Sequence, residues 1–554
     1  MSIGFAALTV FAVICLLAIG LAYAAGLSIR ASRYQSYGGS TYAQLVHDKD
    51  DLNRLGFPQL LLRNYRSSAS FGLSFQQLGL IAGAITVYGF AIEHGGWTVI
   101  GWGWLIMGLF GIAAGAAMAE LSSAFPTAGG PYHWALALGG IKWSWIAGGL
   151  HWMGNIALLA LTNYCGAKLV DTFAAASVGY TSGSGTVLAW MAVFYALQWR
   201  LNLMAARQMR RTIGIGTLLV IGLSVMAIGG LVWFIYPASV PVVSLFDSSI
   251  LLGKSEFVDP GLSSVSGWLV GLLLLQRMFI GSEGGAAGAE ETADPRIRTA
   301  WAVFLSPVYM FVIGFVLLCT VTISLPFVTN NSYLAYGMWI SAIMQPWVRW
   351  DIVIIILLII AVLLSGVPHM NVLSRTLFVA TRDGVLSERL RTGRVSARTG
   401  KPSAAITVSA ALAGTAGLLY VGLMGGGQSS LMTMIGFAIL AVQLACAIPI
   451  GLRLFGKKEK VRSKLQPAPW RLGRLSVLVS WLAWIGMMAS TAGSMLMLSP
   501  IAGAAAAVIV MLAWLAAIIR GNAFKLRLQT AARRSRMELQ RIERKFGPLF
   551  LDGK

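Results

Sequence analysis

An acidic and a basic side chain stand inside one apolar stretch, which runs from Trp268 to Thr299 and reads WLVGLLLLQRMFIGSEGGAAGAEETADPRIRT. Glu283 lies in the run Gly-Ser-Glu-Gly-Gly, which has a poor helix propensity, and Arg277 precedes this run by about one helical turn. A helix that breaks in the bilayer is tolerated only where protein covers it or where it lines a watery cavity. A glycine-kinked helix that only packs closely against a neighbour is the alternative. We expect a substrate site between residues 281 and 286, formed by Gly281, Ser282, Glu283 and Gly284.

Arg277 is an expensive residue to bury, because an arginine at the centre of the bilayer costs about 2.5 to 3.5 kcal/mol on insertion scales. Two roles remain open for it. It can pair with Glu283, or its planar guanidinium can bind the carboxylate of a substrate, a geometry that arginine suits better than lysine. The second role predicts a preference for substrates that carry a carboxylate over purely cationic ones.

A second interrupted helix is expected between residues 71 and 92, where Gly79, Gly83 and Gly89 break up an apolar segment. This segment and the one around Glu283 are the first and the sixth core spans, so they occupy matching positions in two halves of five spans. Paired interruptions at matching positions are the best pointer in a sequence to a transporter site. Half-helices present N–H groups to anions and carbonyl groups to cations, so such a site suits a zwitterion or a small amine. The residues expected to line it in the first span are Gly83, Ala84, Ile85 and Thr86.

The composition is that of a polytopic membrane protein, with 57% hydrophobic residues, 11% charged residues and a mean hydropathy of +0.74. The net charge of +22 does not indicate nucleic acid binding, because the basic residues lie in short segments between apolar stretches. The four cysteines show no CxxC or Cys/His spacing, so neither disulfides nor a metal site is expected. The sequence also contains no recognisable cofactor or catalytic motif. We therefore expect a membrane protein that is not an enzyme and has no cofactor.

The hydropathy pattern predicts an all-α protein with an extra leading span (1–29), a cytoplasmic lead-in (30–70), twelve core spans (71–519) and a basic cytoplasmic tail (520–554). If the spans alternate in direction, almost all of the 42 Lys and Arg residues lie on or beside one face, which is then cytosolic. The exceptions are Lys168, Lys254, Arg349 and the deeply placed Arg277. The core spans are expected at 71–92, 97–122, 141–166, 186–204, 213–236, 264–291, 300–326, 351–378, 403–424, 429–452, 474–498 and 500–519.

Both ends of the chain carry topology signals. The apolar run from Ile3 to Leu27 has no basic residue before it but Arg30 and Arg33 after it, which places the N-terminus outside and the C-terminus in the cytosol. The lack of a basic n-region favours a retained anchor over a cleaved signal peptide, despite the Ala-Tyr-Ala triplet at 22–24. In the tail, basic residues interleave with apolar ones between residues 533 and 546. This pattern predicts either an amphipathic helix on anionic lipid or a solvated helix.

Glu290 and Glu291 follow the interrupted sixth span on its cytosolic side, where a helix dipole disfavours carboxylates by up to about 1 kcal/mol. They are therefore expected to have cationic partners, and the nearest candidates are Arg375 and Arg382, after the eighth span. Such pairs are predicted to latch an inner gate. Two carboxylates that are simply solvated at a helix end are the alternative.

Two further spans carry polar residues that point to the pathway. In the eighth span, Pro368 is expected to kink the helix beside His369 and to free a carbonyl group for an ion. In the third span, His151, Asn155 and Asn163 are expected to line the pathway. The pattern does not decide between a proton and sodium as the coupling ion.

Three segments together resemble motifs of the amino acid, polyamine and organocation transporters, in particular their amino acid and choline branch. They are MAELSSAFPTAGGPYHWA at 118–135, the run from 281 to 295, and SRTLFVATRDGVLSERLRTGRVSARTGKP at 374–402. The resemblance covers roughly residues 51–520 and implies a fold of the LeuT type, with two inverted repeats of five spans. Arg277, Ser282 and Ala287 depart from the residues that are common in the family, and all three flank the expected site.

The resemblance implies a secondary active transporter of amino acids or related amines, a permease of the plasma (inner) membrane that works by alternating access. Two alternatives stay open, a choline or polyamine carrier of the same fold and a nutrient sensor that binds without net transport. The expected partners are a small zwitterionic or amine substrate and the lipid bilayer, with anionic lipid at the basic tail.

Overall fold

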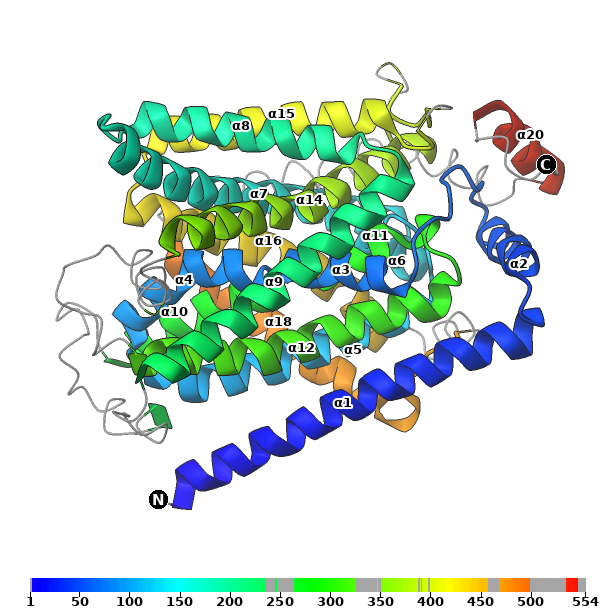
Figure 1. Ribbon diagram of the computed structural model, residues 1–554. Helices are drawn as coiled ribbons and strands as arrows, with labels where there is room; N and C mark the ends of the chain where they lie inside the picture. Colours follow the sequence, from blue (N-terminus) through cyan, green and yellow to red (C-terminus); the bar gives the residue numbers. More distant parts are fainter. Residues whose placement is uncertain are drawn as a thin grey trace.

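The computed structural model describes residues 2–235, 245–246, 264–324, 346, 350–386, 389, 391–396, 399–456, 468–498 and 535–546. Throughout these ranges the regular structure is helical, apart from an isolated bridge between Tyr65 and Thr292. The long helices pack side by side into one bundle (Figure 1). Nine helical segments in the described part are long and apolar enough to cross a membrane. The expected all-helical membrane class is therefore confirmed.

The bundle is built around two interrupted spans. α3 (Ser67–Leu78) and α4 (Leu80–Gly95) form the first, and α10 (Ser264–Gln276) enters the sixth. The expected span at 500–519 lies outside the described residues, so the count of twelve core spans stays a prediction. The surrounding helices are α5 (Trp104–Ala124), α6 (Pro131–Gly139), α7 (Ile141–Val178), α8 (Ser184–Asn202), α9 (Ala206–Ile235), α12 (Pro295–Ser324), α14 (Asp351–Arg382), α15 (Ser403–Met424), α16 (Gln428–Phe455) and α18 (Ser476–Ser494).

Small residues let α5 approach its neighbours closely, as is common for helices that pack inside membranes. A Cβ atom on Gly111 would lie 2.6 Å from the Phe279 ring, and one on Gly115 would lie 2.5 Å from Pro307 of α12. α5 therefore supports both α12 and the segment that follows α10 at van der Waals distance. A larger residue at either glycine would force these elements apart.

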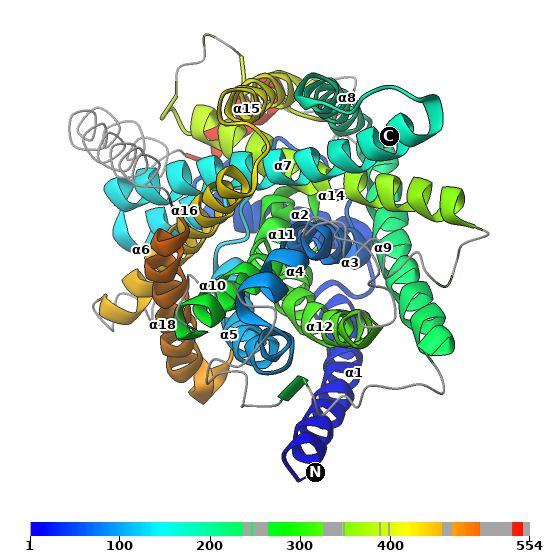
Figure 2. The same cartoon turned by 90° about the vertical axis from the view of Figure 1, so that its left-hand side faces the viewer.

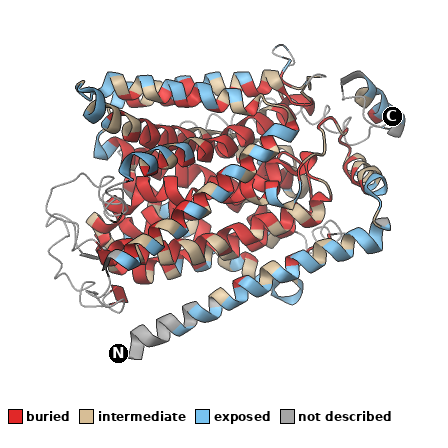
Figure 3. Cartoon of the chain, viewed as in Figure 1, coloured by how far each residue is buried: buried red, intermediate tan, exposed pale blue. Residues whose placement is uncertain are grey.

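The leading helix, α1 (Ser2–Tyr37), lies along the outside of the bundle against α12 (Figure 2). Ala18 and Ala25 are buried, whereas larger side chains such as Leu16 and Tyr23 are exposed. Much of the described part of α1 is exposed (Figure 3). The helix continues beyond residue 29, through the polar residues that follow, so the end of the anchor within it stays a prediction. These residues are compatible with a helix and include no proline that would stop it.

α2 (Thr41–Arg54) and the tail helix α20 (Arg536–Phe546) lie together, at the end of the bundle opposite the start of α1 (Figure 1). Glu543 of α20 lies 2.7 Å from Lys49 Nζ, and Leu539 is buried. α20 therefore turns part of its apolar side to the protein, where an ion pair also holds it. Contact of its exposed basic side chains with anionic lipid stays a prediction.

Candidate functional site

The first core span is interrupted at Gly79, between α3 and α4. Gly79 has a φ of +74°, in the left-handed region that glycine adopts at little cost. The interruption does not extend to Gly83 and Gly89, because both stay helical within α4. A Cβ atom on Gly83 would lie 3.2 Å from Met278 Cγ, so this glycine serves close packing. The expected substrate residues Gly83, Ala84, Ile85 and Thr86 therefore lie inside the buried part of α4, just beyond the break.

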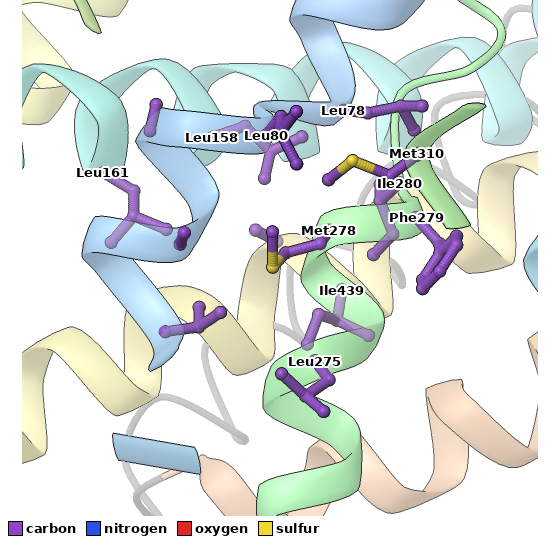
Figure 4. Packing of buried hydrophobic residues seen from close by; sticks show 14 of the residues in the cluster. Leu78, Leu80, Leu158, Leu161, Leu275, Met278, Phe279, Ile280, Met310 and Ile439 are labelled. Carbon is purple, nitrogen blue, oxygen red and sulfur yellow. The ribbon is translucent and has the colours of Figure 1, made fainter. Parts of the chain in front are cut away.

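The sixth span is interrupted after α10, where the glycine-rich run indicates it. The chain forms a 3₁₀ turn (Arg277–Phe279), bends at Gly281 with a φ of +119°, and resumes as the short α11 (Gly284–Ala287). The two interruptions touch, because a Cβ atom on Gly281 would lie 2.7 Å from Gln77 Cγ of α3. Apolar side chains of both broken spans, among them Leu78, Leu80 and Met278, belong to one buried cluster with side chains of neighbouring helices (Figure 4).

Glu283 lies in the second interruption and is buried, with 2% of its surface exposed. Its Oε1 is 3.1 Å from His151 Nε2 of α7, so the partner of Glu283 is His151 and not Arg277. The network continues through Asn155, whose Nδ2 donates to the carbonyl of His151 at 2.9 Å. Asn155 Oδ1 in turn accepts a hydrogen bond from Gln77 Nε2 at 2.8 Å and lies 3.1 Å from His369 Nδ1 of α14. A continuous polar network therefore joins both broken spans to α7 and α14.

Arg277 is also buried, with 1% of its surface exposed. Its Nη1 donates to the carbonyl of Leu78 at 3.2 Å, at the C-terminal end of α3, where a helix dipole favours a positive charge. In the described part of the chain no carboxylate lies within ion-pairing distance of Arg277. The expected pair with Glu283 is thus not formed. Arg277 instead spans the first interruption with donor capacity that this single hydrogen bond does not use up.

Some polar residues of the site were missed in the sequence, and one expected residue lies elsewhere. Gln77 connects the two breaks, and Ser74 Oγ accepts a hydrogen bond from the backbone N–H of Gly285 at 2.9 Å. The signal that reveals Gln77 is its polarity within an apolar span, because such residues are costly in a bilayer. Asn163 instead exchanges hydrogen bonds with Gln198 of α8, at 3.0 and 2.7 Å.

The acidic pair after the second interruption forms two buried ion pairs with α14. Glu291 Oε1 lies 2.5 Å from Arg375 Nη2, and Glu290 Oε2 accepts a hydrogen bond from Arg382 Nη1 at 2.7 Å. Both carboxylates are at most 1% exposed, so the alternative of solvated side chains is wrong. The expected cationic partners are in place, whereas their role as a gate stays a prediction.

The three motif segments meet around these ion pairs, at the end of the bundle near α2. Glu290 Oε1 accepts a hydrogen bond from the backbone N–H of Ala128, in the segment that follows α5, at 3.2 Å. His133 of α6 lies 2.8 Å from Asp383, which also accepts a hydrogen bond from Arg382. The motifs are thus parts of one buried charged cluster, although more than a hundred residues separate some of them.

Lys401 belongs to the same cluster and is fully buried, and its Nζ has no hydrogen-bond partner among the described residues. Burial lowers the pKa of Lys401 from 10.5 to about 7; the neighbouring Glu291 opposes this shift and Arg375 adds to it. A lysine in this position disfavours its own protonated form. The Glu291–Arg375 pair therefore has a group beside it that changes charge close to neutral pH.

We expect Lys401→Met to raise the melting temperature at pH 7. The lowered pKa means that the unfolded chain binds more protons than the folded chain between about pH 7 and 10.5, so stability rises with pH across this window. Methionine removes that penalty, and the melting temperature should become less dependent on pH over the same range. Thermal unfolding of the purified protein measures both effects. Lys142→Met, at an exposed site, is the control, and lower stability of Lys401→Met at every pH would contradict the expectation.

We expect Arg375→Gln to lower the melting temperature strongly, because a buried pair broken on one side costs about 3 to 5 kcal/mol. The double variant with Glu291→Gln should recover part of this loss, since it leaves no uncompensated charge. A coupling above about 1 kcal/mol in the double-mutant cycle marks a direct interaction. Arg453→Gln is the matched control, because it also removes one arginine of a buried pair, that with Glu120, but leaves the Glu291–Arg375 pair intact.

The gating role needs a separate measurement. In a chain without its four native cysteines, a cysteine at the buried Ser282 reports access of a thiol reagent to the second interruption. If the pair is a gate, the double neutral variant should label faster from the α2 side than the parent. An unchanged labelling rate would leave the pair a structural role only.

Two interrupted helices that meet within a membrane bundle, with buried charges at the breaks, are the way in which secondary transporters build their sites. The fold and the site thus define a membrane transporter. The model of the amino acid permease family matches residues 68–519, and the chain belongs to this family. Membership of the amino acid, polyamine and organocation superfamily is thereby confirmed. The protein is an integral membrane transporter and not an enzyme.

The chain is similar to curated amino acid permeases along most of its length. It is 26% identical to the amino-acid permease BAT1 of Arabidopsis thaliana over 459 residues, which cover 78% of this chain and 86% of that protein. It is 24% identical to the BAT1 homolog of Oryza sativa subsp. japonica over 461 residues, which cover 78% and 85%. Among solved structures, MhsT in complex with L-phenylalanine aligns with a TM-score of 0.54 at 15% identity, over 76% of this chain and 98% of that chain. This last likeness concerns the fold alone.

Proposed function

We propose that the protein is a secondary active transporter of amino acids, which binds its substrate between the two interrupted spans. The observation that carries the proposal is that the breaks bring a buried Arg277 and a buried Glu283 to one site without pairing them. A zwitterionic amino acid carries one group for each charge, and its binding offsets the cost of burying both.

The carboxylate of the substrate is assigned to Arg277. This guanidinium lies at Gly79, where α4 begins without a side-chain cap, so the positive end of its helix dipole faces the same place. Arginine binds a carboxylate through two parallel N–H groups, which fixes the orientation of the substrate as well. The substrate amine is assigned to Glu283, on the other side of the contact between the breaks.

Glu283 is also proposed as the group that takes up and releases the coupling proton. It is a carboxylate at a helix break, and among the described residues its side chain contacts His151 Nε2 at 3.1 Å. Protonation of Glu283 would remove the negative charge that holds the amine. The sequence pattern left proton and sodium open, and this geometry supports the proton.

The finer architecture is part of the proposal. We propose twelve core spans: two inverted repeats of five spans each, followed by two further spans. α1 precedes them as an extra anchor, and the family match over 68–519 includes the whole proposed core. In this arrangement the chain lies in the plasma (inner) membrane with its N-terminus outside and its C-terminus in the cytosol. The Glu290 and Glu291 ion pairs then close the cytosolic side, and alternating access requires that they open.

Counterflow in proteoliposomes that contain the full-length chain tests the function. Vesicles loaded with one unlabelled compound should accumulate the labelled compound when it is an amino acid, and not when it is choline or a polyamine. Accumulation of choline or polyamines instead would establish the alternative carrier of the same fold. Saturable binding of an amino acid without any counterflow would favour a sensor and overturn the transport proposal.

A further inference from the structure

A groove of about 400 Å³ lies on the outside of the bundle between α1, α3, α9 and α12. α1 stands beside α12 at the periphery (Figure 2) and packs through small residues, of which Ala18 and Ala25 are buried. The groove therefore stays open between the two helices. Its walls are mostly apolar and include Ala22 and Gly26 of α1 and Leu305 and Tyr309 of α12.

The end of the groove nearest α2 is basic. Arg298 lines it together with Ser67 and Ser68, the first two residues of α3. Arg298 Nε has no hydrogen-bond partner among the described residues. Arg33 and Arg66 lie close enough for their positive charges to act on Arg298.

Two carboxylates, those of Asp294 and Asp48, lie close to this end. Asp294 faces Arg298 and accepts a hydrogen bond from Ser32 Oγ at 3.0 Å. Asp48, which also acts on Arg298, is held by the backbone N–H of Asp294 at 2.8 Å and lies 4.0 Å from Arg63. The basic groups at this mouth are Arg33, Arg66 and Arg298, and the acidic groups are Asp294 and Asp48, the second of which also lies near Arg63. Positive charge is therefore in excess, and the mouth attracts an anion.

The length of the groove matches one leaflet. Arg298 and Tyr309 are eleven residues apart on α12, or about 16 Å at about 1.5 Å per residue. Half of a hydrocarbon core of about 30 Å is almost the same length. An acyl chain that starts beside Arg298 therefore reaches the bilayer midplane near Tyr309.

We propose that this groove binds one anionic phospholipid, with its phosphate at Arg298 and one acyl chain between α1 and α12. Basic clusters between helices near a membrane surface recognise anionic head groups, whereas the apolar groove selects a lipid over a soluble anion. α1 precedes the family match at 68–519 and supplies one wall of the site. The bound lipid joins this additional helix to the transporter core, and the inference does not depend on which substrate is transported.

Native mass spectrometry of the purified full-length chain tests the site, with phosphatidylglycerol and phosphatidylcholine of identical acyl chains as probes. The protein should retain phosphatidylglycerol in preference. Arg298→Gln should weaken this binding about fivefold, the effect of one basic residue against an anionic lipid. Equal retention of the two lipids, or an unchanged affinity in Arg298→Gln, would overturn the proposal.

Two glycines of α1 provide a matched pair that tests the acyl-chain wall. Gly26 lines the groove and Gly20 does not, and a Cβ atom on either would meet nothing within 4 Å. Both positions accept a Cβ atom, so Gly26→Phe adds a ring at the groove, whereas Gly20→Phe adds the same side chain outside it. We expect loss of phosphatidylglycerol binding only in Gly26→Phe. Equal binding by both variants would place the lipid elsewhere and contradict the assignment.

Discussion

Glu283→Gln is expected to reduce amino acid uptake about 10- to 150-fold while the protein remains folded. This range corresponds to the about 1.5 to 3 kcal/mol that a hydrogen bond to a charged group contributes. Glutamine has nearly the same shape, so it can keep the contact with His151 but offers no charge to a substrate amine. Initial uptake rates in proteoliposomes measure the effect, and thermal unfolding checks the fold.

The same variant tests proton coupling. If Glu283 exchanges the proton, wild-type uptake should depend on pH and the dependence should become weaker in Glu283→Gln. The other titratable or charged groups that act on this carboxylate or its network are His151, His369, Arg277 and Cys446. Glu93→Gln, at the far end of α4, is the matched control. Unchanged uptake and an unchanged pH profile in Glu283→Gln would exclude Glu283 from both roles.

Arg277→Gln is expected to weaken the uptake of carboxylated substrates about 10- to 150-fold, for the same loss of a charged hydrogen bond. The effect should be smaller on amines without a carboxylate, because they gain from removal of a like charge. The melting temperature should change little, since Arg277 forms no ion pair with a carboxylate among the described residues and the substitution therefore breaks none. Competition of each compound against a labelled amino acid measures the selectivity.

Arg277→Lys separates charge from shape, because lysine keeps the charge but loses the planar fork. It should retain a part of the carboxylate preference that Arg277→Gln loses. The opposing result is an equal loss for all substrates together with a lower melting temperature. That result would assign Arg277 to capping the Leu78 carbonyl alone. Efficient transport of choline or polyamines by the wild type would also exclude the carboxylate preference.

The membrane class, the two interrupted spans and the need for partners of Glu290 and Glu291 could all be predicted from the sequence. These conclusions hold because they rest on costs that do not depend on the fold: apolar length, helix propensity and the burial of charge. The same reasoning selected Arg375 and Arg382, and the structure forms both pairs. A buried carboxylate requires a cationic partner, and the expected order of the spans placed few basic residues close to Glu290 and Glu291.

Which glycine interrupts the first span, and which residue contacts Glu283, follow from packing between distant segments and could not be predicted from the sequence. Gly79, Gly83 and Gly89 look alike in the sequence, but only Gly79 adopts a positive φ, because packing keeps the others helical. His151 is 132 residues from Glu283, and no local pattern links the two. Likewise, Leu539 of α20 is buried and Glu543 of the same helix pairs with Lys49 of α2, and no local pattern predicts this placement. Local helix propensity predicts where a helix is weak. Contacts between distant segments determine which residue a buried side chain pairs with and which backbone conformation a glycine adopts.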